Sequence, residues 1–383
     1  MIKKICIVTG SRADYGIFYP LLKAIKKDSN FKLQIICTNM HLSKKYGSTY
    51  KEIIKDGFTI SQKIPLETKN NNIHEQVLST SILIKKFSFC INKLKPDLII
   101  LLGDRFETFA SAYVAMINGI PIAHIHGGEL SLGVIDERMR HAITKMSDFH
   151  FTSTLTYKKR LTQMGEVSKN IFNVGSLSVE RIKNMKLLDK KQFEKKINFK
   201  LGEKSILFTY HPTEKKIEDE KKNIKKIFNA LEKIKDYKII FTLPNSDPFS
   251  DCITKSIIKF KNMNSSRSKI FKSMTQNLYY SAMKNCNLVI GNSSSGIIEA
   301  PSLNRNIINI GDRQEGRIQS KNIVNCSLET NLILKTINNI NKNKKKKYKN
   351  PYYKTDTCKE FVRILKKIKL SKKMKKKFYD IKF

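Results

Sequence analysis

The sequence predicts an α/β protein made of two Rossmann-like domains, each with a doubly wound parallel sheet. Short runs of β-favouring residues alternate with longer segments of helical periodicity, which is the order in which parallel sheets are built. The alternation restarts after a highly charged stretch at 183–204, so each half has its own strands. The chain has 383 residues, and a length of this size is typical of two domains of roughly 100–200 residues each.

Each half contains short apolar runs that we interpret as buried strands. In the first half these runs are 5–9, 33–38, 98–102, 120–125, 149–152 and 171–174, with helical segments such as 17–27 and 108–118 between them. In the second half they are 206–210, 239–243, 288–291 and 307–310, with helical segments such as 224–235 and 276–285. A basic helix is expected over 355–377. We therefore expect an N-terminal domain at 1–183, a C-terminal domain at 184–365 and a basic tail at 366–383.

The composition restricts the class of protein. Hydrophobic residues make up 40% of the chain, which is enough for sizeable cores and excludes wholesale disorder. No apolar run approaches the roughly 20 residues of a membrane-spanning helix, and the N-terminus lacks the features of a signal peptide. We therefore expect a cytoplasmic protein with no membrane partner. The seven cysteines form no CxxC pair and are expected to be buried free thiols.

The formal net charge of +40 raises the question of an anionic partner. The excess comes mainly from lysine, which is abundant together with isoleucine and asparagine throughout the chain. This distribution favours solvated helix faces and a basic tail over a nucleic-acid-binding surface. An anionic partner stays open as the alternative, and a nucleotide phosphate would satisfy the charge as well as DNA.

Polar residues follow the predicted strands of the first half, where ligands bind in parallel sheets. Arg12 lies in the segment GSRADYG after the first strand, and Asp104 and Arg105 lie in GDRFE after the strand at 98–102. Neither segment is a GxGxxG dinucleotide fingerprint. The glycine at the first strand end allows a phosphate to approach, although an ordinary turn with a surface Arg12 is the alternative. Asp104 could instead serve only as a helix N-cap.

The segment HIHGGE, residues 124–129, carries the densest group of polar residues in this half, and Asp136 follows it closely. A zinc site formed by His124, His126 and a carboxylate is one interpretation. Acid–base catalysis fits better, because neighbouring carboxylates and histidines push each other's pKa values apart. We expect no metal.

Polar residues also follow the strands of the second half. The serine-rich segment GNSSSG after the strand at 288–291 offers hydroxyl and backbone N–H groups to a phosphate, although plain helix capping is the alternative. The candidates for nucleotide binding in this half are His211, Asn245, Ser293, Ser294, Glu299 and Arg313. Together these features indicate a two-domain nucleotide-sugar protein whose C-terminal half holds most of the nucleotide.

Five segments, taken in order across residues 1–365, resemble the hydrolysing UDP-N-acetylglucosamine 2-epimerases of bacterial sialic-acid and legionaminic-acid pathways. The segments are GSRADYG, GDRFE, HIHGGE…DERMRHAITKMS, the pair His211-Pro212 and GNSSSGIIEAP…IGDRQEGR. The resemblance implies a GT-B-like fold with the active site in the cleft between two Rossmann-like domains. Non-hydrolysing relatives typically begin with a GTRPE-like sequence where this chain has GSRAD, which favours the hydrolysing branch.

The resemblance also implies a reaction. UDP-N-acetylglucosamine, or its analogue UDP-N,N'-diacetylbacillosamine, loses UDP to give a 2-acetamidoglycal, and water then adds to release a free N-acetylmannosamine-type sugar for nonulosonic acid synthesis. The chemistry demands no cofactor or metal. A homo-oligomer, dimer or tetramer, is expected at the level of the family. A non-hydrolysing 2-epimerase and, less favoured, a GT-B glycosyltransferase remain as alternatives.

Residue roles follow from the same resemblance. Asp104, Glu129 and Asp136 resemble the catalytic carboxylates. His126 stands where some members carry a glutamate, and it is expected to act as a base or to position the substrate. The expected substrate and UDP contacts are Arg12 and Arg105 at the sugar or diphosphate, His211, Ser293 and Ser294 at the phosphates, Asn245 and Glu299 at the nucleoside, and Arg313 on the substrate side.

Overall fold

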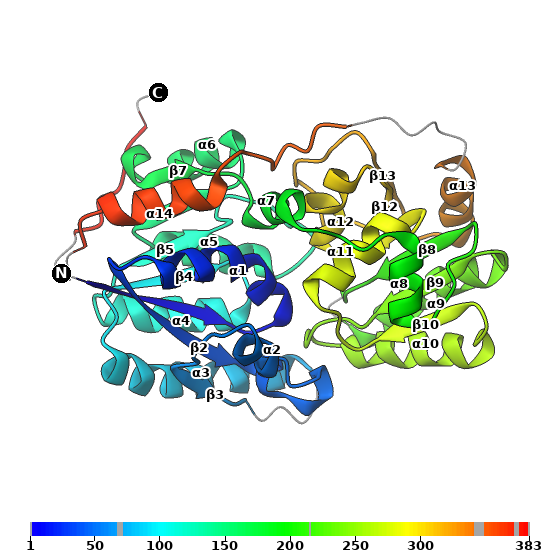
Figure 1. Ribbon diagram of the computed structural model, residues 1–383, viewed down its shortest axis with the longest axis horizontal. Coiled ribbons are helices and arrows are strands. Elements are labelled where there is room, and N and C mark those ends of the chain that lie inside the picture. Colours follow the sequence, from blue (N-terminus) through cyan, green and yellow to red (C-terminus); the bar gives the residue numbers. More distant parts are fainter. Residues whose placement is uncertain (1, 67–71, 214–215, 341–347, 371–374, 382–383) are drawn as a thin grey trace. The chain divides into compact units, whose positions relative to one another are not determined.

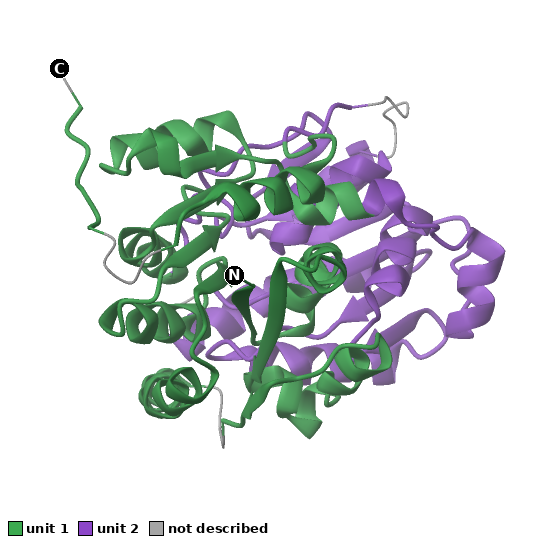
Figure 2. Ribbon diagram, turned by 60° about the vertical axis from the view of Figure 1, so that its left-hand side comes forward, with its two compact units in different colours: residues 1–129, 135–181, 352–383 green, residues 130–134, 182–351 purple. Residues whose placement is uncertain are grey.

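Every strand expected from the sequence forms, and each belongs to one of two parallel sheets (Figure 1). The computed structural model describes residues 2–66, 72–213, 216–340, 348–370 and 375–381. The chain divides into unit 1, at 1–129, 135–181 and 352–383, and unit 2, at 130–134 and 182–351 (Figure 2).

The sheet of unit 1 has the strand order β3-β2-β1-β4-β5-β6-β7. Its strands are β1 (Lys3–Thr9), β2 (Phe31–Thr38), β3 (Gln62–Ile64), β4 (Leu98–Leu102), β5 (Ile122–Ile125), β6 (Phe149–Thr152) and β7 (Ile171–Asn173). All five residues of β4 are buried, as expected of a central strand covered on both faces.

Helices follow the strands of unit 1 and cover the sheet. They are α1 (Arg12–Lys27), α2 (Tyr50–Lys55), α3 (Ile73–Leu94), α4 (Phe106–Ile117), α5 (Asp136–Met146), α6 (Leu155–Gln163) and α14 (Thr357–Lys367). The single-turn helices are η1 (Asn39–Leu42), η2 (Lys44–Tyr46) and η3 (Ser168–Asn170), and α7 (Leu177–Asn184) contains the changeover to unit 2.

Unit 2 repeats this plan with the strand order β10-β9-β8-β11-β12-β13. Its strands are β8 (Ser205–Thr209), β9 (Lys238–Thr242), β10 (Ser268–Phe271), β11 (Leu288–Gly291), β12 (Asn306–Ile310) and β13 (Ile323–Cys326). Its helices are α8 (Lys190–Ile197), α9 (Ile217–Lys233), α10 (Ser250–Met263), α11 (Gln276–Asn285), α12 (Ser294–Ile298), η4 (Ala300–Leu303) and α13 (Thr330–Ile340).

The C-terminal segment returns to unit 1, whereas the sequence placed it in the second domain up to residue 365. Helix α14 packs on α1, and the red α14 therefore lies among blue and cyan elements in Figure 1. The ring of Phe361 is fully buried and stacks on Phe151 of β6, with centroids 3.7 Å apart. Burying one such ring stabilises the fold by about 1.5–3 kcal/mol, which explains why an otherwise basic helix docks here.

The basic tail beyond α14 also lies against unit 1. The expected helix over 355–377 ends at Lys367, and residues 371–374 and 382–383 of the expected tail lie outside the described residues. Lys376 donates to Glu166 over 2.7 Å, and the backbone N–H of Tyr379 donates to the carbonyl of Gly165. The tail is therefore attached at a defined place instead of being only a solvated charge run.

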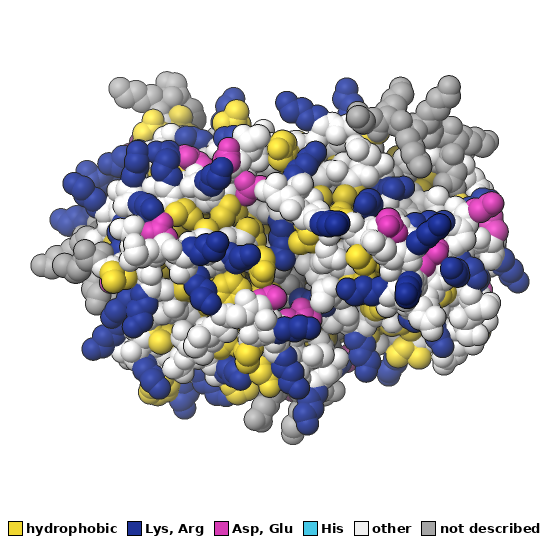
Figure 3. All heavy atoms as spheres, viewed as in Figure 1, with side chains coloured by type: hydrophobic (Ala, Val, Ile, Leu, Met, Phe, Trp, Pro, Cys, Tyr) yellow, Lys and Arg dark blue, Asp and Glu magenta, His cyan; other side chains and the backbone are white. Residues whose placement is uncertain are grey.

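Three properties of the surface and side chains bear on the expected class of protein. No helix within the described ranges is long and apolar enough to cross a membrane. All seven cysteines are free thiols. In Figure 3 the Lys and Arg side chains are scattered over the whole face shown and do not gather in one stripe.

Candidate active site

In the sheet of unit 1 the chain continues from β1 to one side, to β2 and β3, and from β4 to the other side, to β5, β6 and β7. The loops that follow β1 and β4 therefore run in opposite directions at the carboxyl ends of these strands, which is where ligands bind in such sheets. Arg12 opens α1 directly after β1, and Asp104 and Arg105 connect β4 to α4. His126 follows β5, the neighbour of β4. These expected site residues thus lie at the carboxyl ends of three adjacent strands, β1, β4 and β5.

Arg140, on the inner side of α5, joins several of these residues. Its guanidinium is 1% exposed; Nη2 donates to the carboxylate of Asp104 and Nη1 donates to Glu137 over 2.9 Å. Nη1 also donates to the backbone carbonyl of Glu129 over 3.0 Å. A buried cation is stable only when carboxylates and carbonyls surround it in this way. Asp136, at the first position of α5, is half-buried one turn from Arg140.

His126 and Glu129 form a buried pair next to this cluster. Nδ1 of His126 lies 2.5 Å from Oε1 of Glu129, and the hydroxyl of Ser153 donates to the same oxygen over 2.9 Å. The side chains of His126 and Glu129 are 8% and 1% exposed. The carboxylate of Glu129 therefore contacts the Nδ1 side of the His126 ring, and both residues lie in the same turn.

The two arginines expected to contact substrate each pair with a carboxylate. Nε of Arg12 lies 3.0 Å from Glu52, and Nε of Arg105 donates to the buried Glu107 over 3.2 Å. Burial lowers the pKa of Arg12 to about 10 against the opposing effect of Glu52, so Arg12 stays cationic at neutral pH. Both guanidiniums thus keep their positive charge at the ends of β1 and β4.

His124, the other histidine of the HIHGGE segment, is a structural residue. Its Nε2 lies 2.7 Å from the carbonyl of Gly103 and its Nδ1 lies 3.2 Å from the hydroxyl of Thr144. Burial is the main cause that lowers its pKa to about 3, so the ring is neutral. Both nitrogens are occupied inside unit 1, and no group of three or more potential ligands gathers for a metal within the described ranges.

Unit 2 has its own reversal of strand order, between β8 and β11. His211 follows β8 and Asn292 follows β11, and the side chain of Asn292 bonds both the N–H and the carbonyl of His211 at 2.7 Å. The carbonyl of Asn292 accepts hydrogen bonds from Arg313, over 3.2 Å, and from Gln314. Asn292 therefore ties the loops after β8, β11 and β12 together.

The loop after β9 reaches the same place. The backbone N–H of Asn245 donates to Nδ1 of His211 over 3.5 Å, and the carboxylate of Asp247 lies 3.7 Å from that nitrogen. His211 is 6% exposed. Two of the expected nucleotide-binding residues, His211 and Asn245, are thus in direct contact.

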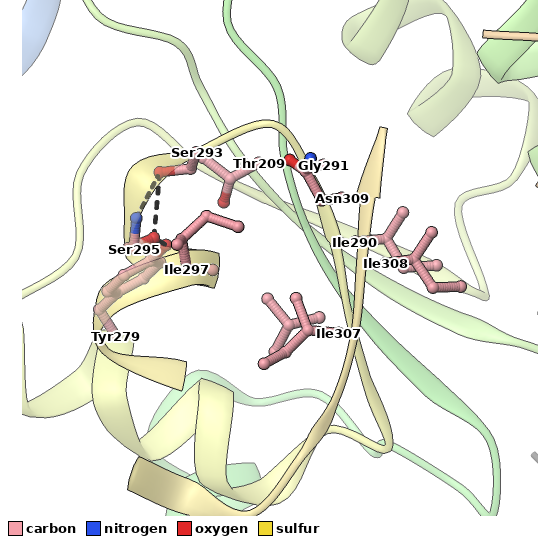
Figure 4. Close-up of a pocket in the computed structure, with 12 residues that line it drawn as sticks. Thr209, Tyr279, Ile290, Gly291, Ser293, Ser295, Ile297, Ile307, Ile308 and Asn309 are labelled. Atoms are coloured by element: carbon pink, nitrogen blue, oxygen red, sulfur yellow. Dashed lines mark hydrogen bonds between the residues drawn. The ribbon is translucent and has the colours of Figure 1, made fainter. Parts of the chain in front are cut away.

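A small pocket in unit 2 lies where α11 and α12 meet the strands β8, β11 and β12, and its lining includes the hydroxyl groups of Tyr279, Ser293 and Ser295 (Figure 4). The hydroxyls of Ser293 and Ser295 lie 3.0 Å apart, and Tyr279 lies 2.7 Å from Ser295. Gly291 has a φ of +142°, and a Cβ there would lie 1.8 Å from the carbonyl of Thr209, so only glycine permits this approach of β11 to β8. Ser294 is the first residue of α12, and Glu299 caps its end and is 6% exposed.

Residues 130–134 interrupt unit 1 but belong to unit 2. Nε of Arg317 donates to the carbonyl of Leu130 over 3.1 Å, and the N–H of Leu132 donates to the carbonyl of Glu315 over 3.4 Å. The segment that separates Glu129 from Asp136 is therefore held by the loop that follows Arg313.

In unit 1 the structure joins Asp104, Glu129 and His126 through Arg140, and in unit 2 it joins His211, Asn245 and Arg313 through Asn292. Arg12 and Arg105 pair instead with Glu52 and Glu107. Four residues that the sequence analysis did not assign also lie among these groups: Ser153, Arg140, Tyr279 and Asn292. Arg140 was detectable, because it lies three and four residues after Glu137 and Asp136 and so shares their helix face. Asn292 directly follows a buried strand, which is the same signal that identified Asp104. Ser153 carries the same signal, because it directly follows the buried strand β6. Tyr279 lies in α11 without a local motif, and only the fold places it.

Comparison with known proteins gives a consistent result. Residues 23–366 match the model of the family described as UDP-N-acetylglucosamine 2-epimerase. The chain is 42% identical to GDP/UDP-N,N'-diacetylbacillosamine 2-epimerase (hydrolyzing) of Campylobacter jejuni, over 85% of each chain. It is 37% identical to polysialic acid biosynthesis protein P7 of Escherichia coli, over 99% of this chain and 98% of that protein.

A further relative, at 34% identity and 97% coverage of both chains, is UDP-N,N'-diacetylbacillosamine 2-epimerase (hydrolyzing) of Legionella pneumophila. Among solved structures, the UDP-GlcNAc 2-epimerase of Methanocaldococcus jannaschii, with UDP-GlcNAc and UDP, matches with a TM-score of 0.79 at 21% identity, over 95% of this chain and 99% of that one. This likeness supports the GT-B-like, two-sheet fold. With two parallel sheets, the match over 23–366 and relatives up to 42% identical, the chain belongs to the UDP-N-acetylglucosamine 2-epimerase family.

Proposed function

We propose that the protein is a hydrolysing 2-epimerase that converts a UDP-linked 2-acetamido sugar to UDP and the free C2 epimer. The observation that carries the proposal is that Arg140 bonds both the carboxylate of Asp104 and the backbone carbonyl of Glu129, whose carboxylate in turn contacts His126. Two relatives at 42% and 34% identity are named as hydrolysing enzymes, which supports hydrolysis over return of an intact nucleotide sugar.

The first half of the reaction is an elimination. The bond between C1 and the β-phosphate oxygen breaks and UDP leaves with the electron pair, while a base takes the proton from C2 and a C1–C2 double bond forms. Asp104, Asp136 and His126 are the proposed proton-transfer groups, and Glu129 belongs to their network. General acid–base catalysis of this kind contributes about 10²–10⁴-fold in rate.

The second half is an addition to the 2-acetamidoglycal. Water supplies the hydroxyl at C1, and a proton returns to C2 from the opposite face, so the configuration at C2 is inverted and the sugar is released free. Arg12 and Arg105 are the proposed cations that stabilise negative charge at the diphosphate or sugar. Each arginine carries a positive charge at a strand end of unit 1.

Unit 2 is the proposed nucleotide-binding unit. Ser293 and Ser294 are the proposed phosphate ligands with His211, and Asn245, Glu299 and Arg313 are the proposed contacts for the nucleoside and the substrate side. The contacts of His211 with Asn245 and with Asn292, and of Arg313 with Asn292, support this assignment because they bring the loops after β8, β9, β11 and β12 together. Support also comes from similar folds solved with UDP or UDP-GlcNAc, including the Neisseria meningitidis enzyme, with a TM-score of 0.77 at 18% identity.

Two sugars fit the proposal, UDP-N-acetylglucosamine and UDP-N,N'-diacetylbacillosamine. We rank the diacetamido sugar first, because relatives from Campylobacter jejuni and Legionella pneumophila are named for it. The product would then enter nonulosonic acid synthesis, and the relative named for polysialic acid biosynthesis supports that assignment.

A homo-oligomer is also part of the proposal. Helices α3 and α4 pack on each other and expose large apolar side chains, among them Val77, Phe89 and Ile117. After Glu107, α4 carries no charged residue, in a chain with a net charge of +40. Light scattering after gel filtration tests this part, and a monomeric mass at micromolar concentration would contradict it.

Mass spectrometry of the products from both UDP-sugars in ¹⁸O-labelled water tests the function. We expect UDP and a free sugar that carries ¹⁸O at C1 and one solvent-derived hydrogen at C2. An intact nucleotide sugar with inverted C2 would instead identify a non-hydrolysing epimerase. Turnover only after addition of a sugar acceptor would identify a glycosyltransferase.

A further inference from the structure

The turn that carries His126 holds the residue in a strained backbone conformation. His126 has a φ of +66°, a left-handed conformation that costs a residue with a side chain about 1 kcal/mol or more. The backbone N–H of His126 donates to the carbonyl of Phe151 over 3.1 Å, and Arg160 donates to the carbonyl of Gly128. A Cβ at Gly128 would lie 2.7 Å from the carbonyl of Tyr157, so the turn has little room to relax.

The contacts of the ring distinguish its two nitrogens. Nδ1 faces the carboxylate of Glu129 at 2.5 Å, and an ionised carboxylate only accepts hydrogen bonds. A neutral imidazole in this place therefore carries its proton on Nδ1. Nε2 is buried and has no hydrogen-bond partner among the described residues. Nε2 is then the nitrogen with a lone pair available for a proton.

Ser153 extends the arrangement from the neighbouring loop. Ser153 is 2% exposed, and its hydroxyl donates to the same Oε1 of Glu129 over 2.9 Å. Ser153 directly follows β6, whose residue Phe151 holds the backbone of His126. The hydrogen bond from Ser153 thus holds the carboxylate of Glu129 in place, and the carboxylate in turn holds the orientation of the His126 ring.

We propose that Glu129 and Ser153 are positioning residues that hold His126 as the Nδ1–H tautomer, so that Nε2 exchanges the proton at the sugar. The proposal rests on the proposed function for the identity of the substrate. It changes the expected part of Glu129 from a carboxylate that touches the sugar to one that acts through His126. It also gives Ser153, which lies outside any motif, a part in the reaction.

The protein contains an internal control for this arrangement. His150, in β6, is also buried, but its Nε2 and not its Nδ1 lies 2.9 Å from a carboxylate, that of Glu166. The two histidines should therefore adopt opposite tautomers for the same physical reason. Glu166→Gln is the matched control for Glu129→Gln, because it removes the carboxylate from the other ring.

The direct test is ¹⁵N NMR of the full chain labelled at histidine, at a pH where the signals have stopped changing. The His126 signals are assigned by their loss in His126→Asn. We expect a proton on Nδ1 and none on Nε2 for His126, and the reverse for His150. Glu129→Gln should alter only the His126 tautomer, and Glu166→Gln only that of His150. A proton on Nε2 of His126 in the wild type overturns the proposal.

Kinetics give a second readout. Glu129→Gln should lower kcat on the order of 10²-fold with KM nearly unchanged, and Ser153→Ala should lower kcat less while moving the His126 signals in the same direction. Full activity of Glu129→Gln contradicts the inference. If Glu129→Gln does not fold, Ser153→Ala and Glu129→Asp carry the test. Failure of the proposed function can be told apart from failure of this inference. In the first case the wild type turns over neither UDP-sugar, whichever tautomer the NMR spectrum shows for His126.

Discussion

Arg140 of α5 donates to the carboxylate of Asp104 at the end of β4, a pairing that links two segments 36 residues apart. The same guanidinium holds Glu137 and the backbone of Glu129. Each of its partners is a group expected to lie at the reaction centre or directly beside it. Arg140 therefore adds a side-chain link between Asp104 and the His126 turn to the backbone hydrogen bond from Gly103 to the carbonyl of Ile125.

Arg140→Lys keeps the charge but loses the fork that reaches three acceptors at once. We expect kcat to fall by at least about 10-fold, because Asp104 and the Glu129 backbone lose their common donor, with the protein still folded. Arg140→Ala removes the buried donor of Asp104, Glu137 and the carbonyl of Glu129 and should destabilise the fold by about 1–3 kcal/mol. Steady-state kinetics and urea unfolding measure the two effects. Wild-type kcat in Arg140→Lys would show that the bridge has no part in the reaction.

Asp104→Asn removes a proposed proton-transfer group and preserves its shape. We expect kcat to fall on the order of 10²-fold or more, while the affinity for UDP changes little because UDP binding is assigned to unit 2. Asp236→Asn is the control, since Asp236 is 57% exposed and pairs with Lys204 at the amino ends of β8 and β9, away from the carboxyl ends where the site residues lie. Near-normal turnover of Asp104→Asn, measured by UDP release, removes Asp104 from the mechanism.

Glu299→Ala should weaken both UDP and substrate, because the two ligands present the same ribose to the proposed acceptor. A lost hydrogen bond to a charged group corresponds to about 1.5–3 kcal/mol, or roughly 10–150-fold in Kd. Glu329→Ala, at a 57% exposed surface position, is the matched control. Calorimetry with UDP measures the effect, and an unchanged Kd would place the ribose elsewhere.

His41 makes the stability of unit 1 dependent on pH. Burial lowers its pKa from 6.5 to about 3, and its ring nitrogens lie 2.9 Å from Thr9 and 2.8 Å from Thr49. Since the unfolded chain binds this proton more readily, the stabilisation is complete above about pH 6.5 and declines as the pH falls from 6.5 towards 3.

His41→Gln retains hydrogen-bonding groups but takes up no proton. Below about pH 6 the wild type should lose about 1.4 kcal/mol per pH unit more than the variant. Urea unfolding at pH 7.5, 5.5 and 4.5 measures the difference between the two slopes. Parallel stability curves for the two proteins would mean that the pKa of His41 is the same in the native and unfolded states.

Lys376 anchors the tail at Glu166, which also contacts Lys145 and His150. Burial alone would raise the pKa of Glu166, but hydrogen bonds and charges from these neighbours lower it to about 2. Lys376→Ala should destabilise unit 1 by about 1–2 kcal/mol. Lys377→Ala, one residue further along the tail, serves as the control. Identical melting temperatures for the two variants would mean that the tail does not dock in solution.

The central strands were predictable because each is an apolar run between turn residues, as in β4 and β11. The edge strands β3, β10 and β13 were missed, since they are short and contain polar residues such as Gln62, Lys269 and Asn325. The residues after central strands were predictable as site candidates for the same reason. Arg140 and Ser153 also carry sequence signals, on the helix face of Asp136 and directly after β6, but only the fold shows that they contact Asp104 and Glu129.

The return of the C-terminus to unit 1 was not predictable from local pattern. Helix α14 reads as a basic, amphipathic helix that could follow either sheet, and the stacking of Phe361 on Phe151 decides its place. A contact between residues 210 positions apart leaves no periodic signal in the sequence.

The five residues at 130–134 connect Glu129 to the segment that begins α5. Arg317 donates to the backbone carbonyl of Leu130, and the N–H of Leu132 donates to the carbonyl of Glu315, so both hydrogen bonds are made within unit 2. These five residues therefore belong to unit 2, although the segments on either side of them belong to unit 1.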